Sequence, residues 1–115
     1  MGAITEEDGK AAQERLAKDG IKVDMVQIDV TDSENIFWAV QKVKQLLDGE
    51  PLYALVNNAG ILKNPKEFYS EEEVNPVMDV NFWGVVRCTQ AFLPLLKEEN
   101  ARVVNTGSGS GCFFV

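Results

Sequence analysis

Histidine is absent from this sequence of 115 residues, and cysteine occurs only at Cys88 and Cys112. Without histidine the common zinc-ligand spacings cannot form, and two cysteines cannot build the disulfide framework of a small secreted domain. We therefore expect no metal site and a reducing intracellular compartment. The absence of histidine also excludes a serine nucleophile of the kind that histidine activates.

Positive charge and long apolar runs are also scarce. The chain has 11 Lys and Arg against 18 Asp and Glu, and its net charge is −7. Because nucleic-acid recognition needs clustered Lys and Arg, we expect no nucleic-acid partner. No apolar run approaches the ~20 residues of a membrane-spanning helix, and the acidic start Thr5-Glu6-Glu7-Asp8 does not resemble a secretory leader. We expect no membrane segment in this chain.

Cap residues and a 3.6-residue apolar period predict three helices. They cover residues 5–19, 32–48 and 70–93. Either Thr31 or Asp32 can cap the second helix, and Ser70 with Glu73 forms a capping box for the third, which Pro94 kinks or ends. The predicted buried stripe of the second helix consists of Ile36, Val40, Val43 and Leu47.

Short runs of strand-forming residues alternate with these helices. Strands are predicted over residues 23–28, 53–56 and 102–106. The run at 53–56 is apolar throughout, which is typical of a parallel strand that is buried on both faces. This alternation predicts an α/β fold with a doubly wound parallel sheet of three strands.

Residues that follow the first two predicted strands are candidates for ligand binding, because ligands bind at the carboxyl ends of parallel strands. Asp29 and Val30 follow the first, where a carboxylate can bind an adenine amino group or simply belong to a helix-capping loop. Asn57-Asn58-Ala59-Gly60 follows the second. Its amides can bind a ribose or brace a neighbouring strand, and Ala59 and Gly60 permit close approach, but a plain turn also needs Asn and Gly.

Two further polar residues stand out. Asn81 lies among apolar residues of the third helix, either on a partly exposed face or holding a water in a proton path together with a backbone carbonyl. Gly84 would let that helix pack closely against the sheet. Ser108, after the last strand in Gly107-Ser108-Gly109-Ser110-Gly111, is either part of a flexible loop or a hydroxyl that stabilises charge on a substrate oxygen.

Four segments in order resemble the short-chain dehydrogenase/reductase family. They are Asp29-Val30-Thr31-Asp32, Asn57-Asn58-Ala59-Gly60, Asp79-Val80-Asn81-Phe82-Trp83-Gly84 and Arg102-Val103-Val104-Asn105-Thr106-Gly107-Ser108. The resemblance covers essentially the whole chain and is strongest to the classical branch with retinol, hydroxysteroid and 3-hydroxybutyrate dehydrogenases. A sugar-nucleotide epimerase shares the fold, but the second and third segments favour the classical branch.

The resemblance implies a Rossmann-like fold and specific roles. Asp29 and Val30 match the adenine-contacting pair, Asn57, Asn58, Ala59 and Gly60 the motif beside an NAD or NADP cofactor, and Asn81 and Ser108 catalytic residues. It also implies an alcohol or ketone substrate, either apolar like a retinoid or steroid or a small hydroxy acid, and a homo-oligomeric parent protein. The parent would reside in the cytoplasm, or in the endoplasmic reticulum or mitochondrion if a preceding segment carries a signal. Gly107 departs from the family, which commonly has a second serine there, and we expect a looser loop.

The family's glycine-rich Thr-Gly-x3-Gly-x-Gly turn and its Tyr-x3-Lys pair are missing from the sequence. We therefore expect residues 1–115 to form one incomplete domain, without the family's first strands and C-terminal part, and to be inactive alone. In the 3-2-1-4-5-6 strand order, the predicted strand at 23–28 would lack its neighbours and expose sheet edges. The alternative is a non-catalytic short isoform that pairs with full-length subunits through the helix around Phe82 to Leu96.

Overall fold

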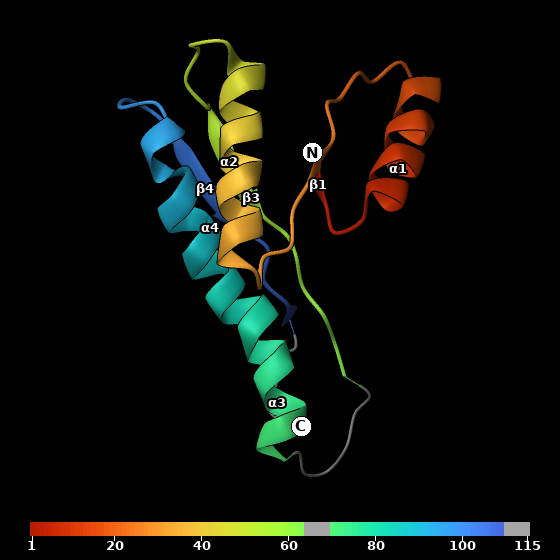
Figure 1. The fold of residues 1–115 in the computed structure, drawn as a ribbon, viewed down its shortest axis with the longest axis vertical. Coiled ribbons are helices and arrows are strands. Elements are labelled where there is room, and N and C mark those ends of the chain that lie inside the picture. The colour runs from red at the N-terminus through yellow and green to blue at the C-terminus, as the bar shows by residue number, and fades with distance from the viewer. Residues whose placement is uncertain (64–69, 110–115) are drawn as a thin grey trace. The chain divides into compact units, whose positions relative to one another are not determined.

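The computed structural model describes residues 1–63 and 70–109, and the chain divides into two compact units, Met1–Glu50 and Pro51–Val115 (Figure 1). Each unit combines one parallel pair of strands with helices. Ser110, Gly111 and Cys112, which the sequence analysis discussed, lie outside the described residues.

The first unit contains a strand that the sequence analysis missed. Strand β1 (Gly2–Ala3) pairs in parallel with β2 (Val26–Gln27), with hydrogen bonds from Val26 N–H to the Met1 carbonyl at 2.9 Å and from Ile28 N–H to the Ala3 carbonyl at 2.8 Å. The expectation that the strand near residues 23–28 lacks its neighbours was therefore wrong. A strand of two residues is too short to show an apolar period, which is why the sequence pattern did not predict it.

The helices of this unit begin and end as their cap residues predict. Helix α1 (Glu6–Lys18) begins after Thr5, whose Oγ1 accepts from Asp8 N–H at 3.1 Å, and it is followed by Gly20 at φ +75°. Helix α2 (Ser33–Leu47) begins after Asp32, whose Oδ1 accepts from the N–H groups of Glu34 and Asn35 at 2.9 and 3.1 Å. Asp32, and not Thr31, is thus the cap.

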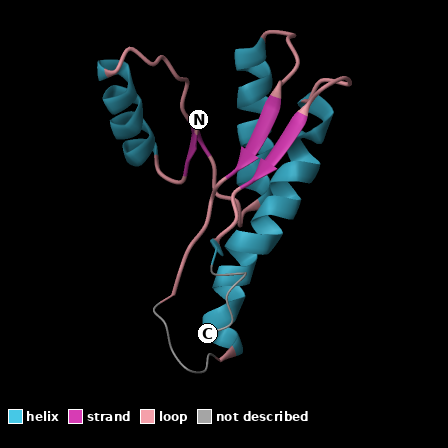
Figure 2. Ribbon diagram, turned by 180° about the vertical axis from the view of Figure 1, so that it is seen from behind, coloured by secondary structure: helices cyan, strands magenta, loops and turns pink. Residues whose placement is uncertain are grey.

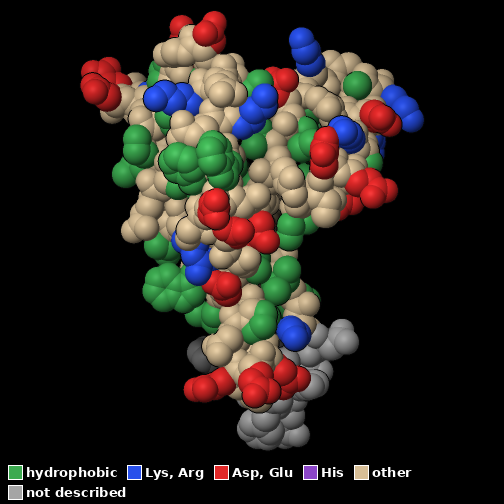
Figure 3. Space-filling model, in the orientation of Figure 1, with side chains coloured by type: hydrophobic (Ala, Val, Ile, Leu, Met, Phe, Trp, Pro, Cys, Tyr) green, Lys and Arg blue, Asp and Glu red, His purple; other side chains and the backbone are tan. Residues whose placement is uncertain are grey.

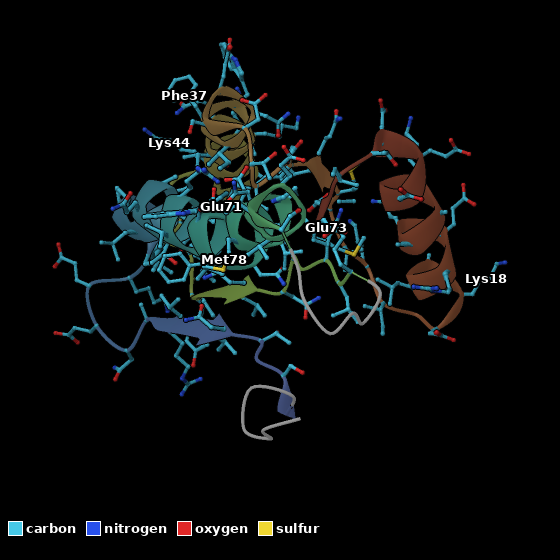
Figure 4. The ribbon with its side chains drawn as sticks, turned by 90° about the horizontal axis from the view of Figure 1, so that it is seen from below. Lys18, Phe37, Lys44, Glu71, Glu73 and Met78 are labelled. Atoms are coloured by element: carbon cyan, nitrogen blue, oxygen red, sulfur yellow. The ribbon has the colours of Figure 1, made fainter. Side chains whose placement is uncertain are left out.

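The buried side of α2 is narrower than predicted. Ile36 is 2% exposed and Ala39 is 3% exposed, whereas Val40, Val43 and Leu47 are only partly buried. Phe37, on the outer side of α2, is exposed (Figure 4). Ile36 and Ala39, which are spaced i and i+3, therefore form the buried face of α2. The other predicted residues of the stripe lie at the border of this face.

The second unit places a pair of parallel strands beside one long helical rod (Figure 2). Strand β3 (Ala54–Asn57) pairs with β4 (Arg102–Asn105) in a register that sets Val56 beside Val104 and Asn57 beside Asn105. The rod consists of α3 (Glu71–Met78), a π-helix (Asp79–Gly84), α4 (Val85–Phe92) and a 3-10 turn (Leu93–Leu95).

The start and end of this rod were predicted, but the π-helix was not. Glu73 accepts from Ser70 N–H at 3.2 Å in the expected capping box, and the acidic first turn of α3 is the red cluster at the lower end of Figure 3. Glu71 and Glu73 lie at the near end of α3 in Figure 4. Pro94 lies in the 3-10 turn that ends the rod. The wider turn at Asp79–Gly84 has no sequence period of its own and could not be read from the apolar pattern.

The described strands therefore number four, in two parallel pairs, rather than three. Both pairs match the 3-2-1-4-5-6 order, in which the second and third strands are neighbours and so are the fourth and fifth. Within the described residues, Val56 is 59% exposed and Val104 is 47% exposed, so one face of the β3–β4 pair is uncovered. The expectation from the apolar run at 53–56 that this strand is buried on both faces was therefore wrong. On the opposite side α4 packs against β3, and Cys88 and Phe92 of α4 are buried.

Gly9→Ala should destabilise the first unit, although alanine is the better helix former. Gly9 is buried, and a Cβ there would collide with the Met25 side chain. We expect a loss of about 1–3 kcal/mol in the free energy of unfolding, measured by urea denaturation, which is the usual cost of overpacking.

The control is the same substitution in a Met25→Ala background. Shortening Met25 makes room for the new methyl group, so Gly9→Ala should then be neutral or stabilising. An equal loss in both backgrounds would contradict the predicted collision.

Candidate functional site

Asn57 joins three elements at the carboxyl end of β3. Its Nδ2 group donates to Thr89 Oγ1 on α4 at 3.0 Å and to Asn105 Oδ1 on β4 at 2.8 Å, and its side chain is buried, at 9% exposure. The carbonyl of Asn57 also accepts from Thr106 N–H at 2.9 Å. Of the two uses considered for this amide, the structure has it brace a neighbouring strand.

The three residues after Asn57 are exposed. Asn58, Ala59 and Gly60 follow the end of β3 directly, so their backbone and the Asn58 amide are accessible from outside. Ala59 and Gly60 carry almost no side chain, which permits close approach of a ligand to the backbone. A contact of Asn57, Asn58, Ala59 or Gly60 with a cofactor remains a prediction.

Asn81 closes the loop that begins at Asn58. Its Nδ2 group donates to the Ile61 carbonyl at 2.9 Å, and its Oδ1 accepts from Ile61 N–H at 2.8 Å. The amide of one exposed side chain thus satisfies both backbone groups of a single residue. The Ile61 carbonyl therefore lies beside Asn81, and the sequence did not reveal this because nothing in an apolar residue marks its backbone as a partner. The water in a proton path remains a prediction.

The π-helix (Asp79–Gly84) carries Asn81. A π-helix of this length is rare, and π-bulges inside α-helices occur frequently at functional sites. Gly84, at its end, is buried, and its close packing against the sheet remains a prediction. Arg87 donates to Asp79 across this segment.

Ser108 follows β4 in an exposed stretch. Among the described residues, a Cβ at the preceding Gly107 would meet no atom within 4 Å. The substrate-facing role of Ser108 and the looseness of its loop remain predictions.

Thr89 and Asn105, which bind the Asn57 amide, were not predicted from the sequence. The feature that could have indicated them is a polar residue within an apolar helix face and within an apolar strand.

Asp29 and Val30 lie in the first unit, just after β2. Asp29 Oδ1 accepts from the Thr31 hydroxyl at 2.7 Å and from Thr31 N–H at 2.9 Å. These bonds, the hydroxyl first, hold the pKa of the Asp29 carboxyl below its usual value. Both of these bonds end on Oδ1.

The described ranges 1–63 and 70–109 contain neither a candidate metal site nor a candidate membrane-spanning helix. In these ranges there is no group of three or more carboxylate or thiol side chains that could bind a metal ion. No helix in this part of the chain has the length and apolar character needed to cross a bilayer.

Comparison with known sequences identifies relatives along nearly the whole chain. The family model described as short chain dehydrogenase matches residues 1–114. Retinol dehydrogenase 16 of Mus musculus is 38% identical over 104 residues, which are 89% of this chain and 33% of that protein. The mitochondrial D-beta-hydroxybutyrate dehydrogenase of Rattus norvegicus is 40% identical over 116 residues, which are 96% of this chain and 33% of that protein. The chain spans about a third of the length of these relatives.

Solved structures share this fold. The Pseudomonas aeruginosa RhlG/NADP active-site complex superposes with a TM-score of 0.84 at 30% identity, covering 99% of this chain and 46% of that one. An alcohol dehydrogenase from the archaeon Thermococcus sibiricus, complexed with 5-hydroxy-NADP, superposes with a TM-score of 0.81 at 26% identity, covering 99% and 48%. The chain belongs to the short-chain dehydrogenase family, whose members use NAD or NADP, and has the partial α/β Rossmann-like fold of that family.

Proposed function

We propose that this chain is the central part of an NAD(P)-dependent oxidoreductase that interconverts a primary or secondary alcohol and its carbonyl. The observation that carries the proposal is the pair of hydrogen bonds between Asn81 and Ile61, directly after Asn58, Ala59 and Gly60 at the carboxyl end of β3. This is the edge of a parallel sheet where ligands bind. The relatives' names support an apolar substrate such as a retinoid or steroid, or a small hydroxy acid.

In this proposal, residues of each unit would hold part of a nicotinamide cofactor. Oδ2 of the ionised Asp29 would accept from the adenine amino group beside Val30, and Asn58, Ala59 and Gly60 would border the cofactor where their backbone is exposed. When bound, NAD or NADP supplies the hydride acceptor or donor. Asn57 would act from behind this surface by fixing the end of β3 through Thr89 and Asn105.

Asn81 and Ser108 would act where the substrate reacts with the cofactor. Asn81 holds the Ile61 carbonyl, which can accept from a water in a proton path. The Ser108 hydroxyl would donate to the substrate oxygen as negative charge develops on it. The Tyr-x3-Lys pair of the family is missing from this sequence, so we propose that residues 1–115 are one incomplete domain and inactive alone. The parent enzyme would be a homo-oligomer in a reducing compartment, and the relative from rat supports the mitochondrion as one candidate.

A second candidate function is a non-catalytic module that pairs with full-length subunits. Exposed apolar side chains on the helical rod favour it, since Phe82 is 49%, Trp83 51% and Leu93 58% exposed. Size-exclusion chromatography with and without a full-length subunit separates the two functions. A module elutes as a defined complex, whereas an incomplete domain self-associates through its uncovered strands.

Thr31→Val should raise the pKa of the Asp29 carboxyl towards its ordinary value, because the hydroxyl that favours the ionised form is removed. The measurement is a carboxyl-carbon NMR titration of Asp29. Folding lowers this pKa, so the ionised carboxylate stabilises the fold above its unfolded pKa, and that stabilisation is lost as the pH falls through the folded value. Thr31→Ser keeps the hydroxyl and should keep the low pKa; an unchanged pKa in Thr31→Val would refute the assigned cause.

Ser108→Ala in the complete parent polypeptide should lower kcat about 10²–10³-fold, as loss of one donor to a developing oxyanion does. The assay follows nicotinamide absorbance with an apolar alcohol as substrate. The control Ser33→Ala lies at the start of α2, outside the site, and should leave kcat unchanged. Equal rates in both variants would remove Ser108 from the proposed mechanism.

A further inference from the structure

An ion pair spans the π-helix that carries Asn81. Nη2 of Arg87 lies 2.6 Å from Asp79 Oδ1, and Nη1 of the same guanidinium donates to the Asp79 carbonyl at 3.3 Å. Asp79 is the first residue of the π-helix, and Arg87 lies in the first turn of α4 beyond it. One guanidinium therefore contacts both the side chain and the backbone at the start of the segment.

The geometry of helices explains why this pair reports on the π-helix. In an α-helix each residue turns by about 100°, so positions i and i+8 lie about 80° apart around the axis and face different directions. A π-helix places one more residue in its turn, which removes about 100° of this offset and brings the two positions to within about 20° of each other. Side chains on a helix also point towards its N-terminus, which directs Arg87 back towards Asp79.

The same extra residue sets the direction of Asn81. Asn81 lies between the two partners of the ion pair, and its amide reaches the N–H and carbonyl of Ile61 at 2.8 and 2.9 Å. If the segment rewound to a regular α-helix, Asn81 would rotate about the axis relative to α4, and both bonds would be lost. The same rewinding would turn Asp79 and Arg87 to different sides of the helix.

The surroundings of this pair strengthen it compared with an ordinary surface pair. The Arg87 side chain is 29% exposed and the Asp79 side chain 40% exposed, whereas the partners of the Lys10–Glu6 pair on α1 are 62% and 64% exposed. Partial shielding from water strengthens a charge pair, and a guanidinium that donates to two acceptors fixes geometry better than an ammonium does.

We propose that Asp79 and Arg87 are positioning residues that hold the π-helix in the register in which Asn81 reaches Ile61. The role in catalysis rests on the proposed function, because it acts through Asn81. The pair itself touches neither substrate nor cofactor in this account, and its effect on Asn81 can be measured without either.

The test is hydrogen exchange by NMR on the 115-residue chain, read at the Asn81 side-chain amide and at Ile61 N–H. Arg87→Met and Asp79→Asn should each speed exchange at both groups roughly fivefold, the factor that a partly exposed charge pair supports. Arg87→Lys keeps the charge but loses the forked geometry and should give a smaller increase. If Arg87→Met does not fold, Asp79→Asn and Arg87→Lys decide the outcome.

The matched control is Lys10→Met, which breaks the exposed pair on α1 and should leave Asn81 and Ile61 unchanged. Thr106 N–H, which pairs β4 with β3, reports general loss of stability. Unchanged exchange in Asp79→Asn and Arg87→Met overturns the proposal, and so does an equal increase at Thr106. Since neither cofactor nor turnover enters this measurement, its failure is distinct from failure of the oxidoreductase assay.

Discussion

The buried amide of Asn57 is the constraint on which the second unit depends. A single NH₂ group donates to α4 and to β4, so it fixes the spacing of a helix and two strands at the edge where the exposed loop begins. Removing it would leave Thr89 Oγ1 and Asn105 Oδ1 without this donor. Thr89 is half-buried and Asn105 is exposed, so water replaces part of the lost bonding and the cost falls below the ~1–3 kcal/mol of a fully buried group. The loop after Asn57 therefore begins at a residue whose position is held by hydrogen bonds. Asn81 holds the same loop a second time, by accepting from Ile61 N–H.

Local chemistry in the sequence was sufficient to predict the helices and most strands. Thr5, Asp32 and Ser70 have side chains that only a helix start uses well, and each lies where its helix begins. The apolar run before Asn57 predicted a strand within one residue of β3. Such features are local, so one sequence carries them in full.

Features that depend on contacts between residues far apart in the chain could not be predicted from the sequence. Strand β1 forms because the Met1 and Ala3 carbonyls accept hydrogen bonds from the backbone of β2 and the residue after it. A strand of two residues is too short to show the alternation of apolar and polar residues that predicts a strand. The π-helix and the role of Ile61 depend on a turn width and a backbone carbonyl, neither of which side-chain type reveals. The motif order in the sequence correctly predicted which residues lie near the end of β3, but not which of them face inward.

The parallel pairing of β3 with β4 also sets the order of folding. Asn57 and Asn105 are 48 positions apart, and the whole helical rod lies between them in the chain. Contacts between such distant positions form slowly, because a long loop must close before any pairing stabilises it. Helix α4 can form early from local contacts, and we expect β4 to pair with β3 only after it. During synthesis β3 therefore leaves the ribosome well before its partner, with Val56 and its backbone available to any other extended chain until Arg102–Asn105 follows.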